Sequence, residues 1–439
     1  MRLLGGRQAT NVTEVRRLFT TFGYLVAKQG ATAAIGLAYW AVVTHLFPAR
    51  DVGLAAAAAS TALLLSALGA LGIPLLLLAE LGQIDAAERR VWFTTGAAVT
   101  ALVVLTLSVG TMALSPFLGK SLQIIGDDPV TAVLFVIGSV GTMVGLTLDN
   151  AAIGLHRGSA QLWRGSLSSV LKLALVGVLV AASTRTSAGL IFAWAAAMVA
   201  SFAVCIPMLR LDRTPAGEGS LHHRAALVRR YKRLSLQHHV LNLSISSVSY
   251  IVPLTATVLI SPSQVAYFSA AYLLSATMLI IPYLLALSLF AEQSGDPGLL
   301  HRHVRRTLPF GLALSGAIVL VVEIAAPYAL RLFGPAYAAN GTTALRILIL
   351  VGPAYVIKDH YVSICRAMGR LSHAAKIMAI GTSVEVMGSA IGGAIWGLTG
   401  ICVGWAVSAS CEALCILPLV LRVYHREPAL APSNSKESG

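Results

Sequence analysis

Twelve apolar stretches, each long enough to cross a bilayer, follow one another along the chain with short polar connectors between them. A spanning helix needs about 20 predominantly apolar residues, whereas a membrane barrel strand alternates apolar and polar positions over about 10 residues. These stretches are apolar on every face, so the pattern predicts helices. The predicted helices cover residues 18–46, 52–79, 91–114, 129–154, 161–183, 187–208, 235–260, 264–290, 307–330, 341–365, 372–396 and 398–421.

The longest polar segment, residues 210–233, divides these helices six and six. The stretches that follow Pro48 and Pro262 are similar, and each ends in Ala-Glu, at Glu80 and Glu292. Six helices per half give two such copies the same orientation, which is typical of transporters built from parallel repeats. We therefore predict an all-α polytopic membrane protein with two six-helix parallel repeats around a central cavity. The expected parts are a cytoplasmic N-terminus (1–17), an N-lobe (18–209), a basic cytoplasmic linker (210–233), a C-lobe (234–421) and a cytoplasmic tail (422–439).

Charge is scarce and unevenly distributed. Charged residues make up 11% of the chain and hydrophobic residues 56%, yet the formal net charge is +14. Of the 32 Lys and Arg residues, 24 fall on one side of the predicted spans, four on the other and four deeper inside the spans; Arg164 and Lys376, near the ends of their spans, are counted with the first side. Positive residues favour the cytoplasmic side, so both termini are expected there, and the charge indicates orientation rather than nucleic-acid binding. Usage rich in Ala and Arg is typical of GC-rich bacteria, so we expect a multi-pass protein of a bacterial cytoplasmic membrane.

The chain carries no signature of enzymatic chemistry. It has no phosphate-binding P-loop, no nucleophile elbow and no metalloprotease motif. Its five Cys lie in or beside the spans without metal-ligand or disulfide spacing, and we expect small buried side chains there. We predict no catalytic residue, no metal and no cofactor. Three pairs of glycines, each pair four residues apart, lie within residues 388–404 and predict close helix packing inside one lobe. We expect a monomer.

Several segments of this sequence resemble one known family. The resemblance spans nearly the whole chain, although each motif is loose, and the last three segments have the order and approximate spacing of that family. The chain thus resembles the Wzx-type polysaccharide exporters and lipid-linked oligosaccharide flippases of the MOP superfamily. The segments are KQG at 28–30, HLFPARDVG at 45–53, LGALGI at 68–73, APYALRLFGPAY at 326–337, LRIL at 345–348 and RAMGR at 366–370.

The resemblance implies a two-lobed bundle with a central cavity, consistent with the repeats. It also implies alternating access of a polyprenyl-pyrophosphate-linked glycan, which moves from the inner to the outer leaflet. The related peptidoglycan-precursor flippases carry two further helices, and only twelve fit here, which favours the Wzx-like branch. The expected partners are this lipid-linked glycan and the bilayer, with H⁺ or Na⁺ as the coupling ion.

Charges inside the spans are the sharpest local signal, because a charge at a helix centre costs about 2.5–3.5 kcal/mol on insertion scales. Such a residue faces a cavity or a charged partner. We expect Lys28, Lys172 and Lys358 to line the cavity, where an ammonium can hold a pyrophosphate or an acidic sugar. Asn242 lies 20 residues before Pro262, as Lys28 lies 20 before Pro48, so Asn242 is expected at the corresponding depth. The alternative for Lys28 and Lys172 is an ion pair between helices, for example with the carboxylate of the residue at position 149.

Four acidic residues inside the spans are candidates for ion coupling or for ion pairs. Asp149 lies near a helix end, Asp359 is next to Lys358, and the other two lie near the midplane. Adjacent residues of a helix do not face each other, so Asp359 and Lys358 need separate surroundings. Glu385 and Glu412 are expected to pair or pack within the C-lobe, and to bind H⁺ or Na⁺ if they face water.

Two other functions fit a protein of this kind. A drug or cation antiporter of the related MATE group should favour acidic cavity residues, whereas the deep charges of the first half are Lys28 and Lys172. A membrane-embedded glycan polymerase or ligase needs a sizeable outer loop for catalytic groups. The longest outer loops, about 115–128 and 331–340, are short and nearly free of His and Glu. The sequence therefore favours the flippase and keeps the antiporter as its alternative.

Overall fold

The structure, a computed structural model, describes residues 33–211, 235–236, 239–240, 242–243, 248–291 and 297–425. Within these ranges every regular element is a helix. Stretches that are apolar on all sides have no polar face to present to water, and only a helix satisfies their backbone groups locally. The predicted N-terminal segment, the start of the first helix, nearly all of the basic linker and the end of the tail lie outside the described residues.

The first half of the chain forms one bundle. A helix over Ala33–Leu46 precedes it. At the start of α6 (Pro129–Gly154), Asp128 caps the helix by accepting hydrogen bonds from the amides of Val130 and Thr131, at 3.3 and 3.0 Å. The hydroxyl and amide of Thr131 hold the pKa of this exposed carboxyl below its usual range. The elements are α2 (Ala49–Gly69), α3 (Ile73–Glu80), α4 (Ala86–Leu114), the short η1 (Ser115–Phe117), α5 (Lys120–Asp127), α6 (Pro129–Gly154), α7 (Gly158–Ala181) and α8 (Ser187–Met208).

The second half forms the other bundle. A helix over Val248–Leu259 leads into it. The long helix α14 (Leu371–Tyr424) contains two residues with non-helical backbone angles, Trp396 and Gly397. They divide it into two antiparallel arms, in which Gly392 faces Gly400. This break falls where the sequence predicts the junction of the last two helices. The elements are α10 (Pro262–Ala291), α11 (Pro297–Arg331), α12 (Pro335–Ile349), α13 (Gly352–Ala367) and α14 (Leu371–Tyr424).

Eight of the described helices are long and apolar enough to cross a membrane, or nine if α12 and α13, bent by 41°, form one span. Counting the two arms of α14 separately adds one span. The shorter apolar helices Ala33–Leu46 and Val248–Leu259 lie within the predicted first and seventh spans. The described residues therefore agree with the prediction of twelve spans.

Two predicted spans are broken. The span over 52–79 is interrupted between α2 and α3, where Leu71 and Gly72 have positive φ angles of 49° and 75°. The span over 341–365 is interrupted between α12 and α13. A proline near the start of α3 and another near the start of α13, Pro74 and Pro353, mark both breaks. By contrast, Pro282 lies inside the uninterrupted α10.

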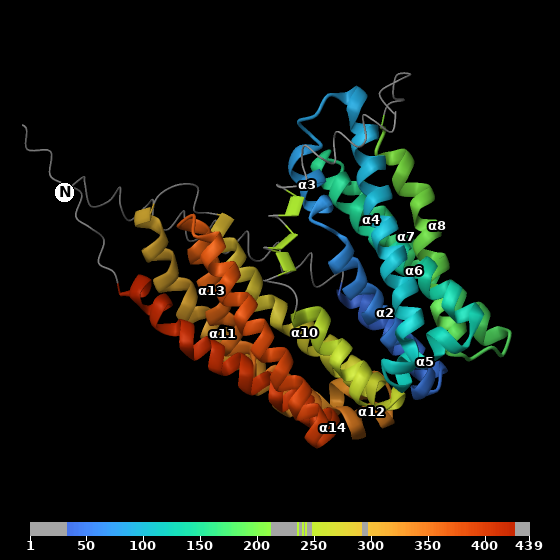
Figure 1. Cartoon of the computed structure of the whole chain (residues 1–439). Coiled ribbons are helices and arrows are strands. Elements are labelled where there is room, and N and C mark those ends of the chain that lie inside the picture. Colours follow the sequence, from blue (N-terminus) through green and yellow to red (C-terminus); the bar gives the residue numbers. More distant parts are fainter. Residues whose placement is uncertain are drawn as a thin grey trace, which may run out of the picture.

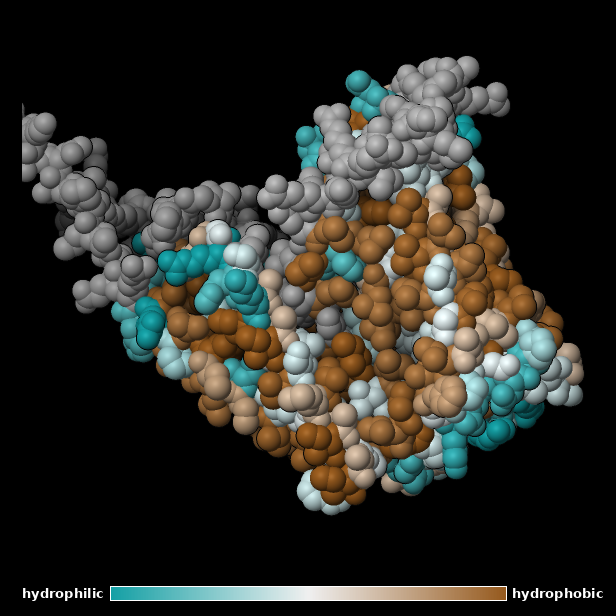
Figure 2. All heavy atoms as spheres, viewed as in Figure 1, coloured by the Kyte–Doolittle hydropathy of each residue, from teal (hydrophilic) through white to brown (hydrophobic). Residues whose placement is uncertain are grey.

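The two bundles meet at one end and diverge toward the other (Figure 1). They meet where α2 and α10 begin, beside α5 and α12, and this end is called the closed end below. Figure 2 shows hydrophobic residues over the flanks of the bundles and hydrophilic residues toward their ends, as expected for helices that face lipid. Two cysteines expected to be buried, Cys411 and Cys415, are exposed on this apolar surface, while Cys205, Cys365 and Cys402 are buried.

Glycines bring the backbones of the two bundles together at the closed end. A Cβ on Gly53 of α2 would overlap the carbonyl of Pro262, the first residue of α10. Likewise, a Cβ on Gly119, whose φ is +87°, would crowd the carbonyl of Val258. Substitution is therefore sterically opposed at both positions, and the bundles are in backbone contact there.

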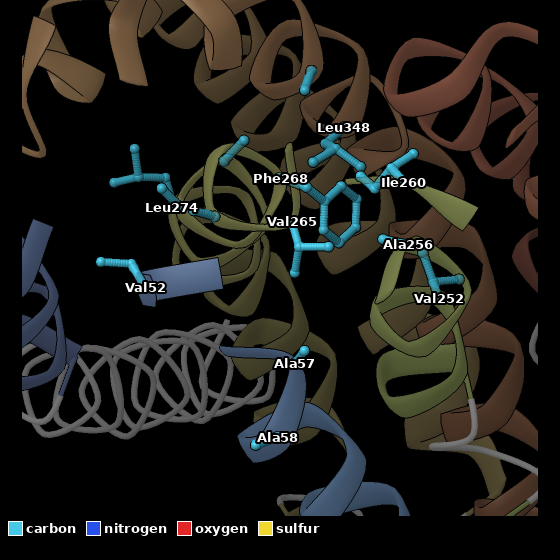
Figure 3. Packing of buried hydrophobic residues seen from close by; sticks show 14 of the residues in the cluster. Val52, Ala57, Ala58, Val252, Ala256, Ile260, Val265, Phe268, Leu274 and Leu348 are labelled. Carbon is cyan, nitrogen blue, oxygen red and sulfur yellow. The ribbon is translucent and has the colours of Figure 1, made fainter. Parts of the chain in front are cut away.

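One hydrophobic cluster continues across this contact (Figure 3). Val52 and Ala57 contribute from α2, Val252 from the helix Val248–Leu259, and Phe268 from α10. All four are at most 1% exposed. Because a single packed core joins both bundles at the closed end, the space between them has a sealed floor there.

The two arms of α14 supply a test of close glycine packing. A Cβ on Gly392 would overlap the backbone of Gly400 in the facing arm, so Gly392→Ala should cost about 1–3 kcal/mol through forced separation of the arms. Gly110→Ala is the matched control, since nothing lies within 4 Å of a Cβ there. The measurement is the thermal unfolding midpoint in detergent. Equal midpoints for the two variants would contradict this packing.

Candidate functional site

A cavity of about 350 Å³ lies between the two bundles. Its walls come from both halves of the chain, and its floor is the packed closed end. The lining residues are Tyr39 and Trp40; Ala55, Ala56, Ala59, Ser60 and Leu63 of α2; Lys172 of α7; Leu190, Ile191 and Trp194 of α8; Ser249, Tyr250 and Pro253; and Phe268, Ser269, Tyr272, Leu273 and Ala276 of α10.

The cavity lies near the middle of the spanning helices. Lys172 is nine residues from Ala181 at the closed end of α7, which is about 14 Å at the rise of an α-helix. The lining residues of α2 and α10 begin six residues after the first residue of each helix, at Ala55 and Phe268. In a hydrocarbon core about 30 Å thick, these positions are close to the midplane.

Aromatic rings form much of the wall. Tyr39, Trp40 and Trp194 come from the first bundle, and Tyr250 and Tyr272 belong to the second half of the chain. The few polar lining groups are mainly serine hydroxyls and tyrosine hydroxyls. Sequence reasoning missed this wall, because aromatic residues in apolar helices are equally common on lipid-facing surfaces. The sequence did contain a signal for this wall, because aromatic residues recur one or two turns from the midplane of several helices.

Lys172 is the one charged side chain among the described residues that line the cavity. Its Nζ lies 4.9 Å from the centroid of the Tyr39 ring, and no carboxylate pairs with it within the described part of the chain. A ring face attracts a cation by about 0.5–2 kcal/mol, which lowers the cost of keeping the ammonium here without neutralising it. The positive charge is therefore free to attract an anion in the cavity.

The other residues expected in the cavity lie elsewhere or outside the described part of the chain. Lys28 is not among the described residues, so its role stays a prediction. Asn242 is in a helical turn with an exposed side chain and is not among the lining residues. Lys358 is 7% exposed inside the second bundle and does not line the cavity. Spacing along the sequence gave their depth but not the direction in which they point.

Asp149 pairs with Arg164 rather than with Lys172. Arg164 Nε lies 2.6 Å from Asp149 Oδ1, and its terminal nitrogen contacts the other carboxylate oxygen, so the pair is bidentate. Gly145 leaves room for the guanidinium, since a Cβ there would come within 3.2 Å of it. Arg164 is 8% exposed, so this residue, grouped by sequence with the orientation charges, instead joins α6 to α7.

The second bundle contains a buried triad of Lys358, Glu385 and Glu412. The Lys358 ammonium contacts both carboxylates, with Glu412 Oε2 at 2.6 Å. Glu385 also accepts hydrogen bonds from Trp405 Nε1 at 2.7 Å and from the Tyr355 hydroxyl at 3.3 Å. Glu385 and Glu412 thus share one partner inside the second bundle, and that partner is Lys358, the lysine predicted from the sequence to line the cavity.

Asp359 has surroundings of its own, as expected for the neighbour of Lys358 on a helix. It is half-buried and makes no hydrogen bond or ion pair within the described ranges. Nearer the closed end, Arg346 Nε lies 3.5 Å from Glu323 Oε2, with both side chains more than a third exposed. The structure therefore divides the charges deep in the described spans into two buried networks, one half-exposed pair, the half-buried Asp359 and the lysine of the cavity.

The buried pair in the first bundle supplies a stability test. Asp149→Asn should cost about 3–5 kcal/mol, because it leaves the Arg164 guanidinium buried without its counter-charge. Replacing both residues with Leu removes both charges and should cost much less. The control is Glu323→Gln in the half-exposed pair, which should cost at most about 1 kcal/mol. Unfolding in detergent measures all three variants, and equal losses for Asp149→Asn and Glu323→Gln would contradict the assignment.

No model of a known protein family matches this sequence. No curated protein matches it either. Solved structures do share its fold. An inward-facing multidrug resistance MATE family transporter of the MOP superfamily superposes with a TM-score of 0.67 at 16% identity, covering 89% of this chain and 94% of its own.

Two further structures agree. An outward-facing multidrug resistance MATE family transporter gives a TM-score of 0.58 at 16% identity and covers 94% of this chain and 96% of its own. A MOP superfamily transporter from Pyrococcus furiosus gives 0.57 at 15% identity and covers 93% and 95%. Identities this low leave substrate and coupling ion open. Since the superpositions cover 89–94% of this chain and 94–96% of the other chains, the chain shares the fold of these MOP superfamily transporters.

Proposed function

We propose that this protein transports a polyprenyl-pyrophosphate-linked glycan from the inner to the outer leaflet of a bacterial cytoplasmic membrane by alternating access. The observation that carries the proposal is the charge of the cavity. Its one described charged group is the Lys172 ammonium, and none of the described lining residues carries a carboxylate. A pyrophosphate or an acidic sugar is stabilised by such a cation, since charge-assisted hydrogen bonds are about twice as strong as neutral ones.

The remaining chemistry of the cavity fits a glycan headgroup. Rings such as Tyr39, Trp194 and Tyr272 offer flat faces against which the C–H faces of sugars pack, and serine hydroxyls offer hydrogen bonds. The volume of about 350 Å³ falls within the range of ligand pockets, ~300–1,000 Å³. A cavity of this size accommodates the pyrophosphate and neighbouring sugars of a lipid-linked glycan, while the polyprenyl chain stays in lipid.

The direction follows from charge and from the closed end. By the positive-inside rule, the closed end faces outward, because Arg302, Arg305, Arg306 and Arg366 lie at helix ends on the opposite side. The cavity would then open to the cytoplasm. In support, the TM-score is higher against the inward-facing MATE transporter, 0.67, than against the outward-facing one, 0.58. An inward-facing cavity is the state that loads substrate from the inner leaflet.

The second candidate is a drug or cation antiporter. Its support is the aromatic wall, which attracts organic cations, and the multidrug transporters that share the fold. Against it stands Lys172, because a like charge in a low-dielectric cavity repels a cationic ligand. For the Pyrococcus furiosus transporter, a reversed polarity of the binding pocket has been taken to indicate a different function. The polarity of the pocket is therefore the feature by which we separate the two candidates.

The test compares the binding of an anionic and a cationic ligand to the purified protein. A polyprenyl pyrophosphate should bind more tightly than a lipophilic organic cation. Lys172→Met should weaken that binding about 10- to 100-fold, the equivalent of one charged hydrogen bond of about 1.5–3 kcal/mol. Lys172→Arg should retain most of it. Native mass spectrometry in detergent measures both ligands on each variant.

The control is Lys120→Met, which should leave binding unchanged, because Lys120 is an exposed residue of α5 at the closed end. In cells, deletion of the gene should cause a lipid-linked glycan to accumulate on the inner leaflet, and Lys172→Met should restore export poorly. Tighter binding of the organic cation, or new drug sensitivity without glycan accumulation, would instead support the antiporter.

A further inference from the structure

The triad in the second bundle has unequal charge. The Lys358 ammonium contacts Glu385 and Glu412, so one positive charge faces two carboxylates. Glu385 is fully buried, while Lys358 and Glu412 are 7% and 9% exposed. With both carboxylates ionised, a net negative charge would remain in the interior of a membrane bundle. Such an uncompensated charge costs several kcal/mol in a dry interior.

One carboxylate oxygen of the triad has no partner. Both oxygens of Glu385 accept hydrogen bonds, one from Lys358 and the other from Trp405 and Tyr355. Glu412 Oε2 contacts Lys358, whereas Glu412 Oε1 is buried without a hydrogen-bond partner within the described residues. A carboxylate of Glu412 whose buried Oε1 accepts no hydrogen bond is less stable here than the protonated carboxyl group. A proton on it neutralises the triad.

We propose that Glu412 binds one exchangeable proton at Oε1, and that the triad Lys358–Glu385–Glu412 is the proton-binding site of this protein. In this step, the Glu412 carboxylate takes up one proton from water to form an O–H bond, and no other bond of the protein changes. The bound form contains one ammonium, one carboxylate and one carboxylic acid, with no net charge.

A sodium ion fits this site poorly. A hard cation needs several free oxygen ligands around it, whereas three of the four carboxylate oxygens here already accept hydrogen bonds from Lys358, Trp405 and Tyr355. The space is also tight, because a Cβ on Gly381 would overlap the Glu412 carboxyl group. Among the two coupling ions expected from the sequence, the geometry thus favours the proton.

Other ionisable groups also lie near the triad. Asp359 of α13 interacts with both Lys358 and Arg366, and these two cations act on its carboxyl group in the same sense. Tyr272 of α10 approaches Glu385 from the cavity side. The buried His360 is occupied by the Val356 carbonyl at 2.8 Å and the Thr307 hydroxyl of α11 at 3.1 Å. Another buried histidine of α11, His303, belongs to the same bundle.

The triad lies directly behind the wall of the cavity. Tyr272 lines the cavity, and its ring centroid is 6.1 Å from that of Trp405. Trp405 donates to Glu385 and packs edge-on against Tyr355 at 5.9 Å. Gain or loss of the proton changes the charge that Trp405 and Tyr355 face, and so acts on the wall that Tyr272 presents to the substrate. Proton binding stands on the triad alone, while its use in transport rests on the proposed function.

Infrared spectroscopy of the purified protein tests the site without any substrate. The wild type should show the C=O stretch of a protonated carboxylic acid at neutral pH, which shifts in D₂O and declines as the pH is raised. Glu412→Gln should abolish this band, because one ammonium and one carboxylate remain and no proton is needed. Glu323→Gln, in the half-exposed pair, is the matched control and should leave the band unchanged.

Absence of the band from the wild type, or its persistence in both Glu412→Gln and Glu385→Gln, would overturn the proposal. Glu385→Gln supplies the same test if Glu412→Gln does not fold, since it also leaves a single carboxylate for Lys358. Transport in proteoliposomes under an imposed pH gradient separates the two proposals. The band without glycan transport would refute the proposed function alone, and glycan transport without the band would refute the proton site alone.

Discussion

The hydrocarbon of a bilayer offers no partner to a charge or to a free backbone group, and this constraint organises the molecule. Every basic side chain deep in the described spans either meets a carboxylate of another helix or faces the cavity. Asp149 and Arg164 neutralise each other between α6 and α7, and Lys358 engages two glutamates across α13 and α14. Lys172 is the exception, supported only by the ring of Tyr39, which is why it is the charge available to a ligand.

The same constraint governs the backbone where helices break. The interruption between α2 and α3 frees the carbonyl of Leu71, which accepts a hydrogen bond from the Ser235 hydroxyl at 2.6 Å. Gly72, with its positive φ, lets the chain of the second half approach at that point, since a Cβ there would overlap the Ser235 carbonyl. Breaks in spanning helices are thus placed in the protein interior, where partners exist.

The cavity and the triad lie on opposite faces of one aromatic layer. On the cavity side, the one cation among the described lining residues lies among rings and hydroxyls, and under the proposed function it would hold an anionic, sugar-like headgroup. On the other side, Glu385 holds Trp405 by a 2.7 Å hydrogen bond, and Trp405 packs on Tyr272. In the two proposals, a substrate and a proton therefore act on the same layer of side chains from two directions. Packed layers of this kind transmit small shifts because they are close-packed rather than deformable.

Features that depend only on apolar length could be read directly from the chain. The number of spans and the junction of the last two helices at Trp396–Gly397 follow from runs of apolar residues and from glycine. Proline by itself does not locate the broken spans, because Pro74 and Pro353 mark breaks whereas Pro282 lies inside the uninterrupted α10. The direction in which a side chain points around its helix could not be read, because helices that are apolar on all sides carry no periodicity to fix it. For that reason only the packing of the bundles decided that Lys358 faces two glutamates, that Arg164 pairs with Asp149, and that Lys172 alone of the described charges enters the cavity.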